Sequence, residues 1–145
     1  MKVRDLMTRD VYVARPNQTI RDVAGMMENI DAGVLPVGDD DRLLGMITDR
    51  DIAIRAVGRG KGPQTLVQDI MSPEVKYCYE DEDTEHVAHN MADQQIRRLP
   101  VVNRNKQLVG ILSLGDLAIV DGAHPAGEAL VGISEPGGRH SQTGP

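Results

Sequence analysis

The sequence repeats itself, and this repeat constrains the fold more than any other feature. At an offset of 64 residues, which becomes 65 in the later part of the repeat, fifteen pairs of residues are identical. Unrelated sequences would share about three over a stretch of roughly fifty positions. The chain of 145 residues is therefore an internal duplication, and its fold must be built from two similar units. The identical pairs include Asp5/Asp69, Leu35/Leu99, Gly45/Gly110 and Asp51/Asp116.

Each copy shows the same order of predicted elements. An extended segment at residues 11–14 or 76–79 comes first, and a helix with apolar residues at i, i+3, i+4 and i+7 follows. Two strands joined by a polar turn come next, and a last helix begins at Asp49 or Leu114. The order β-α-β-β-α predicts an α+β fold. The expected strands span residues 34–38 and 43–47 in the first copy, and 99–103 and 107–112 in the second.

Each copy is expected to be only marginally stable alone, because a unit of about 60 residues buries only about 60% of its unfolded surface. We expect a first repeat at residues 1–60 and a second at 61–122, packed sheet to sheet about a pseudo-two-fold axis. Such packing leaves two related clefts, which are common ligand sites. The repeat pattern ends there, and residues 135–145 are rich in Gly, Pro, Ser and Gln. We therefore expect a largely disordered C-terminal tail at 123–145.

Composition excludes several classes of function. The 22 acidic residues outnumber the 16 Lys and Arg, so the net charge of −6 provides no attraction for nucleic acid. The three aromatic residues, all Tyr, leave few rings for stacking on bases. No apolar stretch approaches the roughly 18 residues of a membrane-spanning helix, and no apolar leader follows the charged N-terminus. We expect no nucleic-acid partner, no membrane partner and a cytoplasmic location.

Candidate reactive residues are few. The single cysteine, Cys78, cannot form an intrachain disulfide, and we expect a buried or partly buried thiol rather than a redox sensor. His86 and His89 lie three residues apart on an expected helix, where a solvated face is the alternative to a zinc site. No nucleophile, base and orienting group can be assembled from neighbouring positions. We predict no catalytic residues, no metal site and no enzyme activity.

The most informative motif occurs once in each copy, where the last strand meets the last helix. It reads GMITDRD at residues 45–51 and GILSLGD at residues 110–116. One interpretation is a capping box, in which Thr48 or Ser113 accepts a hydrogen bond from a backbone N–H and Asp51 or Asp116 complements the positive helix end. The other is a ligand site, in which the carboxylate accepts both hydroxyls of a ribose. The same residues can do both.

The flanking segments extend this motif to a family resemblance. The first copy carries DLMT at residues 5–8, LPV at 35–37 and GMITDRDI at 45–52. The second carries DIMSP at 69–73, RRLPVV at 97–102 and GILSLGDL at 110–117. In this combination the chain resembles a tandem pair of cystathionine β-synthase (CBS) domains, also called a Bateman module. The resemblance covers residues 1 to about 121 and is to stand-alone CBS-pair proteins.

The resemblance implies a regulatory module that binds an adenosyl ligand between the repeats, such as AMP, ADP, ATP, NAD(H) or S-adenosylmethionine. It implies no other cofactor. In the family the Asp of the repeated motif holds ribose, its hydroxyl residue assists, and the apolar residue two places earlier flanks adenine. These roles carry over to Asp51 and Asp116, to Thr48 and Ser113, and to Met46 and Ile111.

The phosphate contacts of the family carry over unevenly. Basic residues just before the Leu-Pro step point to Arg97 and Arg98 in the second copy, whereas the first copy has Gly33 and Val34 there. The resemblance therefore implies two non-equivalent sites, the first of which is either empty or recruits Arg50. The residues expected near the edge of the base, one after each DLM or DIM segment, are Thr8 and Ser72.

Three hypotheses for function follow. In the first, an adenosyl compound favours one arrangement of the repeats, and an unknown regulated protein reads that arrangement. In the second, the chain is a ligand-independent structural dimerisation module. The third, an enzyme that uses Cys78 or a metal at His86 and His89, is disfavoured by the lack of a catalytic grouping. A homodimer is expected under the first two, since CBS pairs associate through helical faces.

Overall fold

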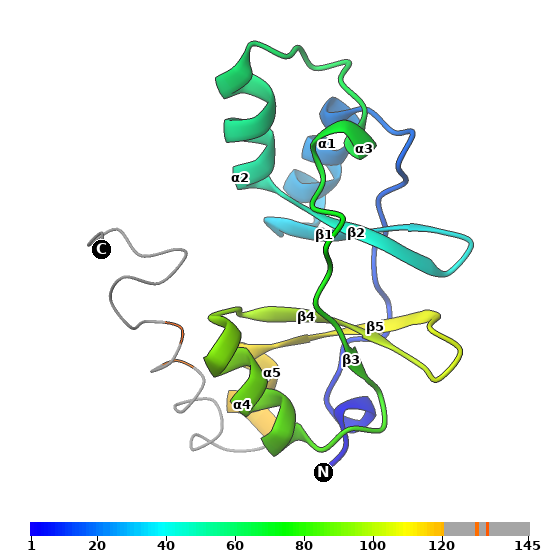
Figure 1. The fold of residues 1–145 in the computed structure, drawn as a ribbon, viewed down its shortest axis with the longest axis vertical. Coiled ribbons are helices and arrows are strands. Elements are labelled where there is room, and N and C mark those ends of the chain that lie inside the picture. The colour runs from blue at the N-terminus through cyan, green and yellow to red at the C-terminus, as the bar shows by residue number, and fades with distance from the viewer. Residues whose placement is uncertain (121–129, 131–132, 134–145) are drawn as a thin grey trace. The chain divides into compact units, whose positions relative to one another are not determined.

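The computed structural model describes residues 1–120 together with Leu130 and Ile133. Apart from those two positions, the tail expected at residues 123–145 lies outside the described residues. The chain forms two compact units (Figure 1). The first-repeat unit consists of Tyr12–Val75 and Lys106–Leu108. Within the described residues, the second-repeat unit consists of Met1–Val11, Lys76–Asn105 and residues 109–120.

The boundaries of these units differ from those of the sequence repeats. Residues 1–11 belong to the second-repeat unit although they open the first repeat. Residues 61–75 belong to the first-repeat unit although they open the second repeat. Each repeat therefore contributes its leading segment to the unit that contains the other repeat.

The first-repeat unit is built on an antiparallel hairpin. Its register runs from Val34 opposite Thr48 to Asp39 opposite Arg42, and Ala14 forms a parallel bridge to Val37. Its elements are α1 (Ile20–Ile30), β1 (Val34–Asp39), β2 (Arg42–Thr48), α2 (Asp49–Asp51), a π-helical stretch η2 (Ile52–Ala56), a 3-10 turn η3 (Val57–Arg59) and α3 (Val67–Ile70).

Local chemistry explains where these elements begin and end. The Thr19 hydroxyl accepts a hydrogen bond from the Asp22 N–H at 3.2 Å, which caps α1. The helix ends at Asp31, whose φ of 53° is left-handed. Asp40 and Asp41 also have positive φ, 48° and 66°, as a two-residue hairpin turn requires. The hairpin turn predicted at residues 39–41 is confirmed.

The second-repeat unit follows the same plan. Its three strands are hydrogen-bonded in the order β3-β4-β5, and β3 runs parallel to β4 with Cys78 opposite Val101. This pair lies 64 positions beyond the bridge of Ala14 to Val37, so the duplication extends to strand pairing. The elements are η1 (Val3–Asp5), β3 (Cys78–Tyr79), α4 (Thr84–Gln94), β4 (Arg98–Val102), β5 (Leu108–Ser113) and α5 (Leu114–Val120).

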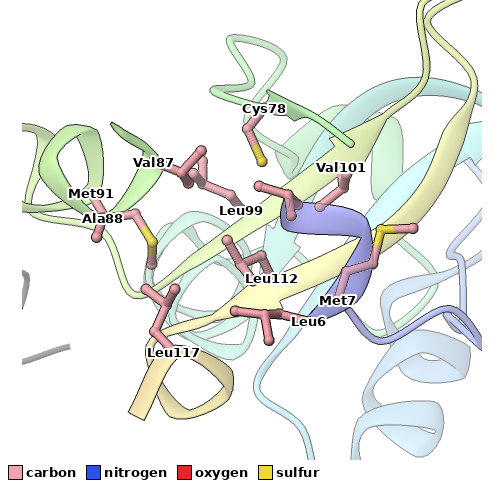
Figure 2. Close-up of a cluster of buried hydrophobic side chains, with 11 residues drawn as sticks. Leu6, Met7, Cys78, Val87, Ala88, Met91, Leu99, Val101, Leu112 and Leu117 are labelled. Carbon is pink, nitrogen blue, oxygen red and sulfur yellow. The ribbon is translucent and has the colours of Figure 1, made fainter. Parts of the chain in front are cut away.

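Each unit has its own aliphatic core. In the second-repeat unit, Leu6 and Met7 from the N-terminal segment belong to the same buried cluster as Leu112 of β5, to which α4 contributes Val87 and Met91 (Figure 2). In the first-repeat unit, Val67 and Ile70 of α3 join a cluster that includes Ile20 and Val23 of α1. The exchanged leading segments are therefore part of the cores and not surface attachments.

The predicted α+β class, the two hairpins and the helix starts at Asp49 and Leu114 are confirmed. The π-helical stretch after α2 was not predicted, because its apolar spacing is compatible with an ordinary helix. Within the described residues, no helix has the length and apolar character needed to cross a membrane.

Candidate functional site

The two strand-to-helix junctions are capping boxes. In the first junction, Asp51 Oδ2 accepts the Thr48 N–H at 3.0 Å and Thr48 Oγ1 accepts the Asp51 N–H at 3.0 Å. In the second, Asp116 Oδ2 accepts the Ser113 N–H at 2.9 Å and Ser113 Oγ accepts the Asp116 N–H at 3.1 Å. The capping interpretation of these residues is confirmed. Each box holds its carboxylate at a fixed place while using one of the two oxygens.

The second oxygen differs between the junctions. Asp51 Oδ1 lies 3.7 Å from Arg55 Nε, and the Asp51 side chain is 14% exposed. Asp116 Oδ1 has no hydrogen-bond or ion-pair partner within residues 1–120, and the residue is partly exposed. The second junction therefore presents a half-buried, orientated carboxylate with a free acceptor, which is suited to a hydroxyl donor.

Arg55 links the first junction to the exchanged segment. Its Nη1 lies 3.4 Å from the carbonyl oxygens of both Ile70 and Met71, in addition to the contact with Asp51. The aligned residue of the second repeat, 65 positions later, is Val120, so this link is specific to the first junction. Sequence reasoning missed Arg55. Its i,i+4 spacing from Asp51 is the signal that could have identified it.

The apolar candidates lie beside the exchanged segments. Met46 and Ser72 exchange two backbone hydrogen bonds, of 3.0 and 2.9 Å, in the first-repeat unit. Ile111 and Thr8 exchange two, both of 2.9 Å, in the second-repeat unit. The structure thus pairs Thr8 and Ser72, the candidates for the edge of the base, with Ile111 and Met46, the candidates for its face. Met46 and Ile111 are partly exposed, as a surface for adenine requires.

Glycine makes these close pairings possible. A Cβ at Gly45 would lie 2.7 Å from the Ser72 carbonyl oxygen, and a Cβ at Gly110 would lie 2.8 Å from that of Thr8. Both distances are shorter than real Cβ atoms show. The glycine that opens each repeated motif therefore leaves room for the backbone of a segment that is distant in the sequence.

The cationic candidates are exposed. The carbonyl oxygen of Arg97 accepts the Leu114 N–H at 2.9 Å, so this arginine adjoins the start of α5. In the part of the chain that the structure describes, the guanidinium groups of Arg97 and Arg98 form no hydrogen bond or ion pair. Arg50, the candidate of the first junction, is also exposed, and its backbone N–H donates to Asp49 Oδ1 at 2.8 Å.

The remaining reactive candidates are not assembled into a centre. Cys78 is buried as expected, and burial, with a smaller effect of Glu82, raises the pKa of its thiol to about 12. His86 lies 3.6 Å from a Glu82 carboxylate oxygen and His89 lies 3.3 Å from one of Asp93, each at i,i+4 spacing on or next to α4. Among the described residues, no group of three His, Cys, Asp or Glu side chains is placed to hold a metal ion.

Proteins of known sequence are similar to this chain along nearly its whole length. The CBS domain protein YhcV of Bacillus subtilis is 44% identical over 91% of this chain and 94% of its own length. YlbB of the same organism is 36% identical over 92% of each chain.

Solved structures share the fold. Hypoxic Response Protein I, solved with two coordinated zinc ions, matches with a TM-score of 0.74 and 33% identity over 81% of this chain and 97% of its own. The CBS domain pair of MJ0100, solved in complex with 5′-methylthioadenosine and S-adenosyl-L-methionine, matches with a TM-score of 0.72 and 29% identity. The match covers 81% of this chain and 93% of that domain pair. A hexameric CBS-CP12 protein from bloom-forming cyanobacteria matches with a TM-score of 0.70 and 27% identity, over 83% of this chain and 67% of its own.

The CBS domain model matches twice, at residues 3–58 and 67–121, which are the two halves of the duplication. With its paired junctions and exchanged leading segments, the chain belongs to the CBS domain family and carries two CBS domains in tandem.

Proposed function

We propose that the chain is a regulatory module that binds adenosyl compounds at its two junctions. One observation carries the proposal: the Ser113 N–H holds the Asp116 carboxylate through Oδ2, while Oδ1 has no partner among residues 1–120. The backbone of Arg97 contacts the start of the same helix, through the Leu114 N–H. A ribose offers two hydroxyl donors to such a carboxylate. The complex of the similar MJ0100 domain pair with two adenosyl compounds supports the same class of ligand here.

The other candidates then receive roles. Asp51 takes the place of Asp116 in the first junction, with Thr48 and Ser113 as hydroxyl partners. Arg97 and Arg98 meet phosphate in the second junction, and Arg50 is the candidate cation of the first. Met46 and Ile111 flank adenine, and Thr8 and Ser72 approach its edge. Since the chain has no Phe or Trp, aliphatic side chains and backbone groups supply the base contacts.

The proposed readout is a change of arrangement on binding that a partner protein recognises. The ligand shifts this equilibrium by its difference in affinity for the two arrangements. In this proposal the module is cytoplasmic, homodimeric and without catalytic activity of its own.

A ligand-independent dimerisation module is the second candidate, and one observation favours it. Ile54 and Val57, on the segment formed by η2 and η3, have exposed fractions of 48% and 68%. Large apolar side chains exposed this far on one short segment fit a contact with a second copy of the chain.

Calorimetry with adenosine, AMP, ADP, ATP, NADH and S-adenosylmethionine tests the proposal. The informative variant is Asp116→Asn, because Asn keeps an oxygen for the Ser113 N–H and removes the charge. We expect about 10- to 100-fold weaker binding, since a hydrogen bond to a charged group contributes about 1.5–3 kcal/mol. Asp31→Asn, at the left-handed end of α1, has the same charge change and is the matched control.

Two outcomes decide between the candidates. If none of these compounds binds more tightly than about 1 mM, the adenosyl proposal is rejected. Sedimentation of the chain with and without ligand then tests the alternative: a dimer that is unaffected by every nucleotide, and that Ile54→Asp dissociates, supports the structural module.

A further inference from the structure

The two junctions place different residues at equivalent backbone positions. In the second junction, the Leu114 N–H donates to the Arg97 carbonyl oxygen at 2.9 Å. In the first, the Asp49 N–H donates to the Gly33 carbonyl oxygen at the same distance, 2.9 Å. The same backbone contact thus joins arginine to leucine in one junction and glycine to aspartate in the other.

The Asp49 carboxylate occupies the space next to Gly33. A Cβ built on Gly33 would lie 2.8 Å from Asp49 Oδ2 and 3.3 Å from Asp49 Oδ1. In the second junction the Arg97 side chain begins at the equivalent position. The first junction therefore has a negative group close to the point where the second has the start of a cationic side chain.

In the described part of the chain, this negative charge has no ion-pair partner. Asp49 is exposed, and its Oδ1 accepts the backbone N–H of Arg50 at 2.8 Å. Within residues 1–120, no Lys, Arg or His side chain lies within ion-pairing distance of Asp49. Arg55 is the cation that contacts a carboxylate in this junction, but its partners are Asp51 and the carbonyl oxygens of Ile70 and Met71, not Asp49.

We propose that Asp49 makes the first junction select against phosphate. This inference rests on the proposed function. The first junction takes an adenosyl compound whose 5′ substituent carries no phosphate, and the second junction, with Arg97 and Arg98, takes a phosphorylated one. One chain would then sense two chemically distinct classes of adenosyl ligand.

The expected discrimination follows from Coulomb's law. A phosphate dianion about 6 Å from a carboxylate in water-like surroundings is disfavoured about tenfold in affinity relative to a neutral group. The factor grows where the junction is less exposed to water. An uncharged thioether substituent avoids this repulsion, so both junctions accept it.

The test compares AMP with 5′-methylthioadenosine by calorimetry on the full chain. We expect methylthioadenosine to bind at two sites per chain with affinities within about threefold of each other. We expect AMP to bind at one tight site and at one site at least about tenfold weaker. Asp51→Ala identifies the weaker AMP site as the first junction by abolishing it.

The deciding variant is Asp49→Asn, which keeps an oxygen for the Arg50 N–H and removes the charge. It should strengthen AMP binding at the weaker site about tenfold and leave methylthioadenosine within twofold. Asp40→Asn, in the turn between β1 and β2, is the matched control, because Asn tolerates the left-handed φ of 48° there.

Two results would overturn the inference while leaving the proposed function standing. One is equal AMP affinity at the two sites of the unaltered chain. The other is an Asp49→Asn variant that binds methylthioadenosine normally and shows AMP affinity within twofold of the unaltered chain. Failure of both compounds to bind the unaltered chain would instead reject the proposed function itself.

Discussion

Replacing Gly110 by alanine tests whether the exchanged N-terminal segment depends on a bare backbone in β5. The new Cβ would lie 2.8 Å from the Thr8 carbonyl oxygen and 2.8 Å from Met7 Sδ. The methionine end can move, but the carbonyl belongs to backbone that exchanges two 2.9 Å hydrogen bonds with Ile111. Moving it far enough to relieve the contact breaks or weakens both bonds. At about 1 kcal/mol for each bond, we expect a loss of about 2 kcal/mol of unfolding free energy.

Urea unfolding followed by circular dichroism measures this loss of unfolding free energy. In a thermal melt, the same loss should lower the melting temperature by about 6 °C for a chain of this size. Hydrogen exchange locates it, because the amides of Thr8 and Ile111 should lose protection first. Gly25→Ala is the control: Gly25 lies within α1, and a Cβ there would meet no atom within 4 Å apart from its chain neighbours and the helix's own backbone. This substitution should stabilise the chain by about 1 kcal/mol. Unchanged stability of Gly110→Ala, with normal exchange at Thr8, would refute the reasoning.

Four further outcomes are expected. Arg55→Met should cost about 1 kcal/mol of unfolding free energy in urea, since its contacts are long and partly exposed; a change below 0.3 kcal/mol, on the order of measurement error, would contradict this. The Cys78 thiol should react with a disulfide reagent at pH 8 about 1000-fold more slowly in the folded chain than in urea, because its pKa is raised from 9.0 to about 12. The thiol then stays protonated in the folded chain while the unfolded chain releases its proton, so stability falls as pH rises from about 9 to 12, and Cys78→Val should remove that part of the slope. The hydrogen bonds from Arg104 lower the pKa of Asp81, so Arg104→Gln should raise the pKa of the Asp81 carboxyl, as followed by NMR titration. An unchanged pKa would contradict the contribution of this pair.

Features that arise from short stretches of sequence were predictable. The apolar spacing around Val23 and Val87 predicted the two long helices, and the hydroxyl and carboxylate three residues apart predicted the boxes at Thr48 and Ser113. These depend on backbone groups within four residues, where periodicity and capping rules apply.

Features that depend on distant pairing were not predictable in the same way. Thr8 and Ile111 are 103 positions apart, and no local rule states that they pair. Gly45 and Gly110 were visible as identities between the repeats, but their reason lies in the segments that approach them. The position of the Asp49 carboxylate next to Gly33 also needed three-dimensional coordinates, because residues 16 positions apart meet there across a strand end.

The exchange of leading segments makes one unit an insertion in the other. Tyr12–Val75 lies, along the chain, between the first and second segments of the second-repeat unit. During synthesis from the N-terminus, nearly all of the first-repeat unit emerges before the strand that Thr8 needs for pairing. The N-terminal segment, with its apolar Val3, Leu6 and Met7, has no complete core to join until β5 and Leu117 have been made. Cutting the chain at the border of its sequence repeats would leave two fragments, each with an unsatisfied edge and a segment that belongs to the other.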